Sequence, residues 1–570
     1  MRKRFPKLLL ITVVAMGLGL TAGLMPAQQQ QPPAQQAADA NNGMEVLSRG
    51  PVHEAYADTH AESSSTPAVT KMPPDGIEEL PPDHKPDGNN VQWIPGYWHW
   101  DEDRKDFTWI SGFWRSVPPG RVWVPGSWRG VPDAQQNSWQ WVPGVWQEAP
   151  AQQAIQGQQA QHEVQYLSEP PKTLEVGPQS TAPTATSFYS PGGWVWRGGR
   201  YAWQPGYWME YRAGWVWVPP HYRWSPIGYI YVEGYWDYPL ATRGVMYAPV
   251  GYTNAVYLQP GYVYTPTYVV SDQCMMGAMF VRRGWGCYYF GDYYGPAYAT
   301  GGYSAWCGTT GPNGVFVVGY GAGPRWGYDP LWGYYSVAYR GSPGWRDGMG
   351  TLYVGRFNGT IAPPPVTLVQ QNIYINRVTN VTVVNVTNSY TVVGGSITVG
   401  NVNVSGMAMV APTRIVVDMH PEMRIQPLPM AARREEVVAA RQMREAAAQR
   451  MRAENALVAR GDRIPRAGQA PHTTKLEVPR AAIARAQIDE KKAPPPNPHK
   501  TAAAVDHAAT NHVEPKAEHT TGQTTPKVDP KGPNAPKVDP KGPTTPKIDP
   551  KGPTTPNKND PKRDQKNEKP

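Results

Sequence analysis

Residues 193–238 constrain the fold of this chain more than any other stretch. Pairs of turn-forming residues recur there every seven residues, including Gly198-Gly199, Pro205-Gly206 and Pro219-Pro220. Between successive pairs lie five residues, of which the second and fourth are almost always aromatic. Side chains alternate between the two faces of a strand, so this spacing places the rings on one face. We predict an antiparallel meander of strands of about five residues with an aromatic face.

The turn residues also predict which rings face each other. Gly-Gly forms a two-residue hairpin loop readily, which pairs Trp196 with Tyr201 and Trp194 with Trp203. The pairs predicted by the same counting at the other turns are Trp203–Trp208, Trp217–Tyr222, Trp224–Tyr229 and Tyr231–Trp236. Pro-Gly turns splay hairpin strands and Pro-Pro fits a two-residue loop poorly, so we expect some of these turns to be wider corners.

A second block of aromatic repeats covers residues 91–146. Its phrases of the form W-V-P-G-x-W begin at Trp93, Trp109, Trp123 and Trp141, with spacings of 16, 14 and 18 residues. A fixed phrase at variable spacing is typical of strand–turn units whose outer loops differ in length. We therefore expect this block to be β structure as well.

The phrases in residues 91–146 and 193–238 resemble the YXWGXW-repeat family of bacterial exported proteins. The resemblance implies export and tandem β repeats, and the family has no established biochemical role to carry over. Three positions depart from the phrase: Ser111 and Glu233 replace the proline, and Pro220 replaces the glycine. The turns at these positions therefore need not all be alike.

The N-terminal 25 residues have the pattern of a signal peptide. Arg2, Lys3, Arg4 and Lys7 precede an apolar run at residues 8–20, and small residues follow it. An uncleaved membrane anchor is the alternative, which the small residues disfavour. We expect export to the periplasm, the cell surface or the medium, with no membrane span in the mature chain.

The composition divides the remainder into segments and predicts an all-β fold with one C-terminal helix and long disordered terminal segments. No Trp, Tyr or Phe follows Tyr390, so the core is expected between residues 91 and about 419. The predicted segments are a disordered leader (26–90), repeat block 1 (91–146), a Gln/Ala-rich linker (147–190), repeat block 2 (191–246), a Gly/Tyr-rich β region (247–365), a Val/Asn/Thr-rich β segment (366–420), a charged helix (430–460) and a disordered basic Pro/Lys tail with ten-residue repeats (461–570). The helix has a narrow apolar stripe, which favours a solvated helix or a loose oligomer contact over a core helix.

The sequence contains no pattern typical of a catalytic, cofactor or metal site. His99 and His221 lie within repeats and are expected on strand surfaces. In an oxidising compartment we expect a disulfide between two of Cys274, Cys287 and Cys307. A hydrolase hidden in the Gly/Tyr-rich region is a minor alternative.

The aromatic face has two interpretations. It is either core, or a platform on which sugar rings or other flat ligands stack. The candidate stacking residues are Trp203, Trp208, Trp217, Trp224 and Trp236. The leading hypothesis is an exported non-enzymatic structural or surface-interaction protein, and the alternative is a module that binds polysaccharide or cell-wall glycan.

The tail adds an expectation about partners. Residues 521–570 carry 11 Lys and Arg against 6 Asp and Glu, and their prolines favour an extended spacer. We expect contact with envelope polysaccharide or another polyanionic polymer through the aromatic face and this tail. No specific nucleic acid partner is expected, and self-association is left open.

Overall fold

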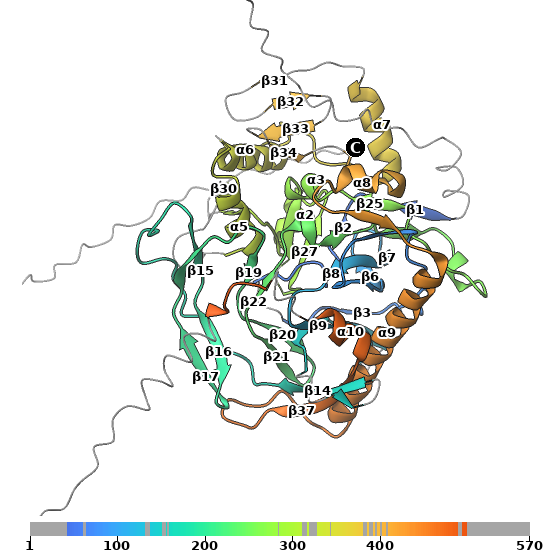
Figure 1. The fold of residues 1–570 in the computed structure, drawn as a ribbon, viewed down its shortest axis with the longest axis vertical. Coiled ribbons are helices and arrows are strands. Elements are labelled where there is room, and N and C mark those ends of the chain that lie inside the picture. The colour runs from blue at the N-terminus through green and yellow to red at the C-terminus, as the bar shows by residue number, and fades with distance from the viewer. Residues whose placement is uncertain are drawn as a thin grey trace, which may run out of the picture. The chain divides into compact units, whose positions relative to one another are not determined.

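The computed structural model describes residues 43–60, 64–131, 137–150, 155–156, 159–282, 284–310, 316–318, 328–342, 344–379, 385–386, 391–393, 396–399, 402–405, 408–487 and 493–498. The described chain is mostly β structure, arranged as many small antiparallel sheets with few helices (Figure 1). This confirms the predicted fold class. The signal-peptide pattern and the decapeptide tail lie outside the described residues.

The repeats fold as units that we call kinked ribbons. In ribbon 1, β6 (Tyr97–Asp101) and β7 (Asp106–Ile110) form a hairpin, while β5 (Val91–Ile94) pairs with β8 (Phe113–Ser116). The chain passes from β5 to β6 through Pro95-Gly96 and from β7 to β8 through Ser111-Gly112. One long two-stranded hairpin therefore bends both of its strands at the same level, at a corner formed by two copies of the repeat phrase.

Three more kinked ribbons have the same connectivity, an inner hairpin and an outer pair. Ribbon 2 consists of β9 (Arg121–Val124), β10 (Ser127–Val131), β11 (Ser138–Val142) and β12 (Val145–Glu148). Ribbon 3 consists of β15 (Ser187–Ser190), β16 (Gly193–Arg197), β17 (Arg200–Gln204) and β18 (Tyr207–Glu210). Ribbon 4 consists of β19 (Val216–Val218), β20 (His221–Ser225), β21 (Gly228–Val232) and β22 (Tyr235–Asp237).

The strand registers correct half of the predicted ring pairs. Pairing across Gly198-Gly199 is as predicted, and so is the pair Trp224–Tyr229. The predicted pairs Trp203–Trp208, Trp217–Tyr222 and Tyr231–Trp236 are wrong, because their turns are corners and not hairpin loops. The outer strands there pair instead as Tyr189 with Trp208 and Trp217 with Trp236.

Residues 43–60 and 64–90, which were expected to be part of a disordered leader, are built into the fold. The strands β1 (Met44–Val46), β2 (Gly50–Pro51), β3 (Ala68–Val69) and β4 (His84–Pro86) pair with β24 (Val250–Tyr252), β27 (Cys287–Phe290), β11 and β36 (Ile425–Pro427), respectively. Val52, Ala55 and Tyr56 are buried in the main core. A few well-placed apolar residues and edge pairing order this segment despite its polar composition.

A similar correction applies to the predicted linker and to the start of the tail. In the linker, β13 (Ile155–Gln156) pairs with β14 (Gln159–Tyr166), and β14 pairs along its whole length with β37 (His472–Pro479), which is followed by α10 (Arg480–Arg485). Each of these two polar strands supplies the backbone partners of the other. Order in the tail therefore extends past residue 461.

The region between the repeats and the C-terminal helix is mixed. Its strands include β23 (Gly244–Val245), β25 (Tyr268–Val270), β26 (Met279–Arg282), β28 (Tyr303–Ala305), β29 (Gly308–Thr310), β30 (Phe316–Val318) and β35 (Val410–Pro412), and β31 (Asn385–Val386), β32 (Thr391–Val393), β33 (Ser396–Val399) and β34 (Val402–Ser405) form one sheet. Its helices are α2 (Leu240–Arg243), α3 (Asp272–Met276), α4 (Pro296–Thr300), α5 (Pro330–Ala338), α6 (Trp345–Phe357), α7 (Leu368–Thr379) and α8 (Val416–Met419). Helix α7 occupies residues that the Val/Asn/Thr composition predicted to be strand, so that part of the prediction is wrong.

Helix α9 (Met430–Ala459) confirms the predicted helix but not its solvated character. It lies against β5, β9, β10 and β37, and Ala440, Met443 and Ala447 on its inner side are buried. Alanines let the helix approach the strands closely, and the buried charge of Arg450 is paired with Glu454 at 2.8 Å. A narrow apolar stripe is therefore enough for a core helix here.

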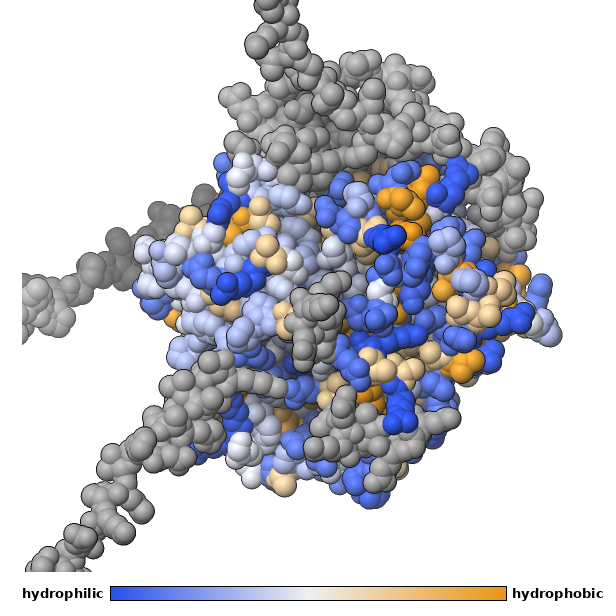
Figure 2. Space-filling view, in the orientation of Figure 1, coloured by the Kyte–Doolittle hydropathy of each residue, from blue (hydrophilic) through white to orange (hydrophobic). Residues whose placement is uncertain are grey.

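The outer strands of ribbons 1, 2 and 4, together with β21, contribute to one large core, which also includes residues of α3, α5 and α6. The inner strands of ribbon 1 and the outer strands of ribbon 3 pack in two smaller clusters. Figure 1 places β16 and β17 of ribbon 3 on the opposite side of the drawing from α9. On the face drawn in Figure 2, apolar residues occur in small groups scattered among polar ones.

Candidate functional site: the corners of the kinked ribbons

Each corner carries four aromatic rings, which form two cross-strand pairs, one on either side of the bend. The eight pairs are Trp93–Trp114 and Trp98–Trp109, Trp123–Trp146 and Trp128–Trp141, Tyr189–Trp208 and Trp194–Trp203, and Trp217–Trp236 and Tyr222–Tyr231. Ring centroids within these pairs are 5.1 to 5.6 Å apart, mostly edge to face or tilted. Such pairs stabilise short strands beyond the area they bury.

The glycine of the repeat phrase is required by close packing at the corner. A Cβ on Gly112 would lie 2.7 Å from the indole Cζ2 of Trp93, and one on Gly126 would lie 2.5 Å from that of Trp141. A Cβ on Gly234 would likewise lie 2.6 Å from Cζ2 of Trp217. The first tryptophan of one phrase thus covers the glycine of its partner phrase.

A buried carboxylate closes the corner of ribbon 1. Glu79 Oε2 accepts the backbone N–H of Gly96 at 2.9 Å, and Oε1 accepts that of Gly112 at 2.8 Å. Oε1 also accepts the indole N–H of Trp109 at 2.8 Å. The side chain is buried, and burial raises the pKa of Glu79, against the effect of Arg444 and these N–H donors. We call this arrangement a carboxylate clasp.

The clasp recurs in two more of the four described ribbons. In ribbon 2, Glu54 accepts the Gly144 N–H at 2.9 Å and the Trp141 indole N–H at 2.6 Å. Burial raises the pKa of Glu54 to about 7, although those donors, Arg223 and Arg450 oppose the rise. In ribbon 3, Glu175 accepts the Gly192 N–H and the hydroxyl of Tyr189. All three glutamates come from segments outside the repeats.

Ribbon 4 has a different corner. Pro220 stands where the other phrases have glycine, and it has no N–H to donate. Its contacts involve carbonyl oxygens instead: Arg121 donates to the Glu233 carbonyl at 2.8 Å, and Asn497 Nδ2 donates to that of Gly234 at 2.7 Å. Pro220 and Glu233, which depart from the repeat phrase, therefore lie at a corner whose backbone carbonyls accept hydrogen bonds from side chains. No carboxylate closes this corner in the described residues.

Proline-rich segments also accept hydrogen bonds from ribbon tryptophans. Trp98 Nε1 of ribbon 1 donates to the carbonyl of Asp75 at 2.8 Å, and Trp194 Nε1 of ribbon 3 donates to that of Lys172 at 3.0 Å. Trp236 Nε1 of ribbon 4 donates to the carbonyl of Pro496 at 3.3 Å. The ribbons therefore bind extended segments of their own chain through indole N–H groups.

The predicted stacking residues fall into two groups. Trp217, Trp224 and Trp236 in ribbon 4 are buried, with 1%, 7% and 5% of their surface exposed. Trp203 and Trp208 in ribbon 3 are half-buried. The structure therefore places the first three in the interior and leaves the ribbon 3 rings partly accessible.

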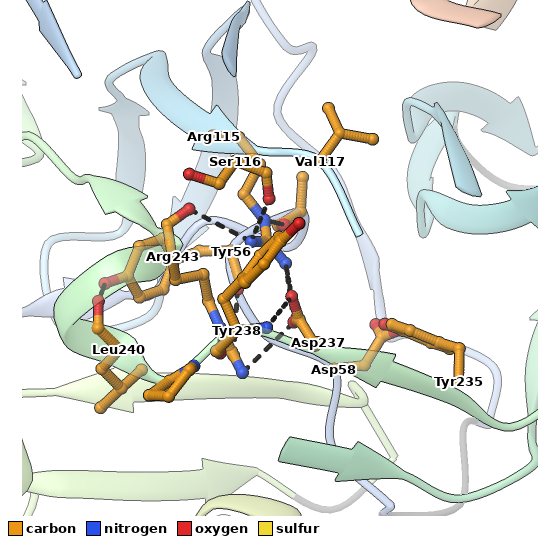
Figure 3. A network of polar contacts seen from close by, with 12 residues as sticks. Tyr56, Asp58, Arg115, Ser116, Val117, Tyr235, Asp237, Tyr238, Leu240 and Arg243 are labelled. Atoms are coloured by element: carbon orange, nitrogen blue, oxygen red, sulfur yellow. Dashed lines mark hydrogen bonds and ion pairs between the residues drawn. The ribbon is translucent and has the colours of Figure 1, made fainter. Parts of the chain in front are cut away.

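A buried ion-pair network joins ribbons 1 and 4 to α2 (Figure 3). Arg115 on β8 donates to both carboxylate oxygens of Asp237 at 2.7 and 2.8 Å, and Arg243 lies 3.2 Å from the same carboxylate. Backbone carbonyls of Ala55 and Tyr56 accept from these two arginines. All three charged side chains are almost fully buried, so the network serves the fold and not a solvent-accessible reaction.

The two histidines expected on strand surfaces are buried. His99 lies against Trp285 and Tyr289, and burial together with Arg282 lowers its pKa to about 3. His221 lies 3.3 Å from Asp58, which also accepts hydrogen bonds from Arg223 and Tyr235. Burial alone would raise the pKa of Asp58, but Arg223 and His221 hold it well below its ordinary value. Both faces of these strands are covered, which corrects the surface assignment.

Cys274, Cys287 and Cys307 are buried, and the expected disulfide between two of them is not formed in this structure. Burial raises the pKa of Cys287 to about 12. Within the described ranges, no three His, Cys, Asp or Glu side chains are placed to hold a metal ion. Among those same residues, no helix combines the length and the apolar character that crossing a membrane requires.

Over the residues that the structure describes, the fold and the corners define an all-β repeat protein with four kinked ribbons, three of them closed by a carboxylate clasp. Comparisons of the chain with protein-family models, with curated proteins and with solved structures found no match. Sequence reasoning missed Glu54, Glu79 and Glu175 because they lie in polar segments that resemble disorder. A signal was available for two of them: Pro-Pro precedes Glu79 and Glu175 by five and four residues.

Proposed function

We propose that this chain is an exported, non-enzymatic structural or surface-interaction protein, as the resemblance to the YXWGXW-repeat family implies. The observation that carries the proposal is the burial of the repeat tryptophans. Trp93, Trp109, Trp114 and Trp146 have 0% of their surface exposed. Rings used in this way stabilise a scaffold and are not available to a ligand.

The same burial explains why the repeats serve a scaffold well. Strands of four or five residues bury too little surface to be stable alone, and a two-stranded hairpin is marginal in water. Packing of the ring pairs and closure of the corner supply the missing stability. Several such ribbons together provide a scaffold on which surface features can be displayed.

The export part of the proposal is tested by cell fractionation. The full chain is expected in the periplasm, on the surface or in the medium, and a chain without residues 1–25 is expected to stay in the cytosol. Recovery of the full chain from the cytosol would contradict the proposal.

A basic tail in the exported chain is expected to bind polyanionic envelope polymer, weakly and in a salt-dependent way.

A polysaccharide-binding module is the second candidate, and ribbon 3 is the region that favours it. Trp194, Trp196, Trp203 and Trp208 are half-buried there, and rigid rings with a polar edge suit sugar stacking. Titration of tryptophan fluorescence with soluble glycans and cell-wall fragments tests this candidate. A saturable change that is lost in Trp203→Ala would support glycan binding, and no change with any glycan would argue against it.

A further inference from the structure

Two ribbons bind an extended segment of the chain in the same way. The segments are residues 73–81 on ribbon 1 and residues 168–180 on ribbon 3, which we call the ribbon 1 strap and the ribbon 3 strap. In each, the residue directly after Pro-Pro accepts the indole N–H of the second ring of the first phrase, Trp98 or Trp194. In each, a glutamate farther along the strap enters the corner. The two straps therefore show which groups a ribbon corner binds, namely a backbone carbonyl after Pro-Pro and a glutamate carboxylate.

The ribbon 3 strap is held at three places. The Lys172 carbonyl accepts from Trp194, Glu175 accepts from Gly192, and the Ser180 hydroxyl accepts from Trp208 Nε1 at 3.1 Å. A Cβ on Gly192 or Gly206 would lie 2.9 or 2.7 Å from the same Glu175 oxygen, so the carboxylate fits between the two glycines of the corner. The backbone carbonyl of the residue after Pro-Pro and the glutamate carboxylate are thus the two recognised features.

The two straps differ in how deeply they are buried. On ribbon 1, Glu79 is 2% exposed and the strap continues into the core through Ile77. On ribbon 3, Leu174 and Val176, the neighbours of the clasping glutamate, are 57% and 56% exposed. In the described chain, residues 168–186 form neither helix nor strand, so this strap can leave without breaking the ladder of β14 or β15. The ribbon 3 corner is therefore built like its buried counterpart but closed by a loosely packed segment.

We propose that the corner of ribbon 3 is a binding site for an extended peptide segment of a partner protein, one in which Pro-Pro precedes a glutamate by about four residues. Residues 168–180 are an internal ligand that such a segment displaces. The proposal deepens the surface-interaction role proposed above and rests on it only for its biological setting. Indole N–H groups that bind carbonyls of a proline-rich chain are a general mode of peptide recognition, because the extended conformation is already populated before binding.

Competition by the internal strap sets the expected affinities. A tethered segment has a high effective concentration, so a free peptide binds the wild-type chain more weakly than the intrinsic affinity of the site. Glu175→Lys places a cation against the Gly192 N–H and releases the strap. Glu169→Lys makes the same charge change at an exposed side chain of the strap outside the corner, and is the matched control.

The test uses the full chain and a dye-labelled 13-residue peptide with the sequence of residues 168–180, followed by fluorescence anisotropy. We expect the peptide to bind the Glu175→Lys chain at least tenfold more tightly than the wild-type or the Glu169→Lys chain. A peptide with glutamine at the position of Glu175 should bind at least tenfold more weakly. Hydrogen exchange at the Gly192 N–H should rise in Glu175→Lys and fall again when the peptide binds.

Equal affinity of the peptide for the wild-type and Glu175→Lys chains, or equal binding of the glutamate and glutamine peptides, would overturn the proposal. If hydrogen exchange shows that β15 and β18 are lost in Glu175→Lys, the test is made on the wild-type chain instead. Excess labelled peptide must then raise hydrogen exchange in residues 168–180 of the wild-type chain. Unchanged exchange in this strap would count against the binding site. These binding results do not depend on where the cell places the chain, so they can fail while the proposed export stands.

Discussion

Gly96 and Gly112 donate their backbone N–H groups to the two oxygens of a single carboxylate, that of Glu79. The two glycines belong to successive copies of the repeat phrase, and the carboxylate belongs to neither. One copy of the phrase is therefore half of a structural unit, and in ribbon 1 a third segment supplies the acid that completes it.

Gly112→Ala should be strongly destabilising. Its Cβ would lie 2.7 Å from both the Ile94 carbonyl and the Trp93 ring, and neither can move without opening the corner. We expect a loss of about 3 kcal/mol in the free energy of unfolding, at the upper end for overpacked cores. Gly130→Ala is the control, because a Cβ there meets nothing within 4 Å. Urea unfolding followed by tryptophan fluorescence compares the two, and similar midpoints would contradict this account of the corner.

Removal of the Glu79 carboxylate should lower the free energy of unfolding more than removal of the neighbouring Glu78 carboxylate. Glu79→Ala leaves three N–H donors of ribbon 1 without an acceptor, and a buried donor left unpaired costs about 1–3 kcal/mol. We expect a loss of about 3–5 kcal/mol. Glu78→Ala removes ion pairs with Arg441 and Arg444 that are more exposed, and should cost at most about 1 kcal/mol. Unfolding of both variants at the same denaturant concentration would show that the clasp does not stabilise the fold.

Glu54 should make stability depend on pH. Burial raises its pKa from 4.5 to about 7, so between these values the folded chain holds a proton that the unfolded chain has lost. The resulting stabilisation is complete below pH 4.5 and is lost as the pH rises through 7. It amounts to about 3 kcal/mol, from ~1.4 kcal/mol per pKa unit.

Glu54→Gln isolates this effect from other titrating groups. The difference in unfolding free energy between the wild type and Glu54→Gln should fall by about 3 kcal/mol between pH 4.5 and pH 8. Denaturant unfolding at a series of pH values measures this difference. A difference that stays flat across the range would show that Glu54 titrates as it does in the unfolded chain.

Asp237→Asn should be more damaging than neutralisation of a surface acid. It leaves Arg115 and Arg243 buried without a counter-charge, and breaking a buried pair in this way costs about 3–5 kcal/mol. Asp106→Asn, which removes a half-exposed pair with Lys71, should cost at most about 1 kcal/mol. Thermal unfolding of the two variants provides the comparison, and a smaller effect for Asp237→Asn would refute the role assigned to the network.

The parts of the fold that depend on local chemistry could be predicted from the sequence. Gly198 and Gly199 have φ values of 56° and 75°, which a tight hairpin turn requires and glycine permits, so the Trp196–Tyr201 pair was predictable. Helix α9 was predictable for the same reason, because its residues favour helix throughout and Pro429 precedes it.

The corners were not predictable in this way, because each is defined by two distant phrases and a third segment. Pro205-Gly206 alone reads as a turn, and only the pairing of Tyr189 with Trp208 makes it a bend in a continuing ribbon. Likewise, nothing local distinguishes Glu175 from a solvated acid in a polar linker. Its role follows from the Gly192 N–H and the Tyr189 hydroxyl, which the folded ribbon brings together.

The ladder between β14 and β37 gives this chain a late step in its folding. Tyr166 and Thr474, 308 residues apart, lie on paired strands, so during synthesis β14 emerges long before its partner exists. Ribbons 1 and 2 are complete in sequence by then and can collapse as each hairpin is made. Closure of this ladder must wait until β37 has been synthesised. A polypeptide that stops after α9 would leave β14 as a bare edge, open to pairing with other chains.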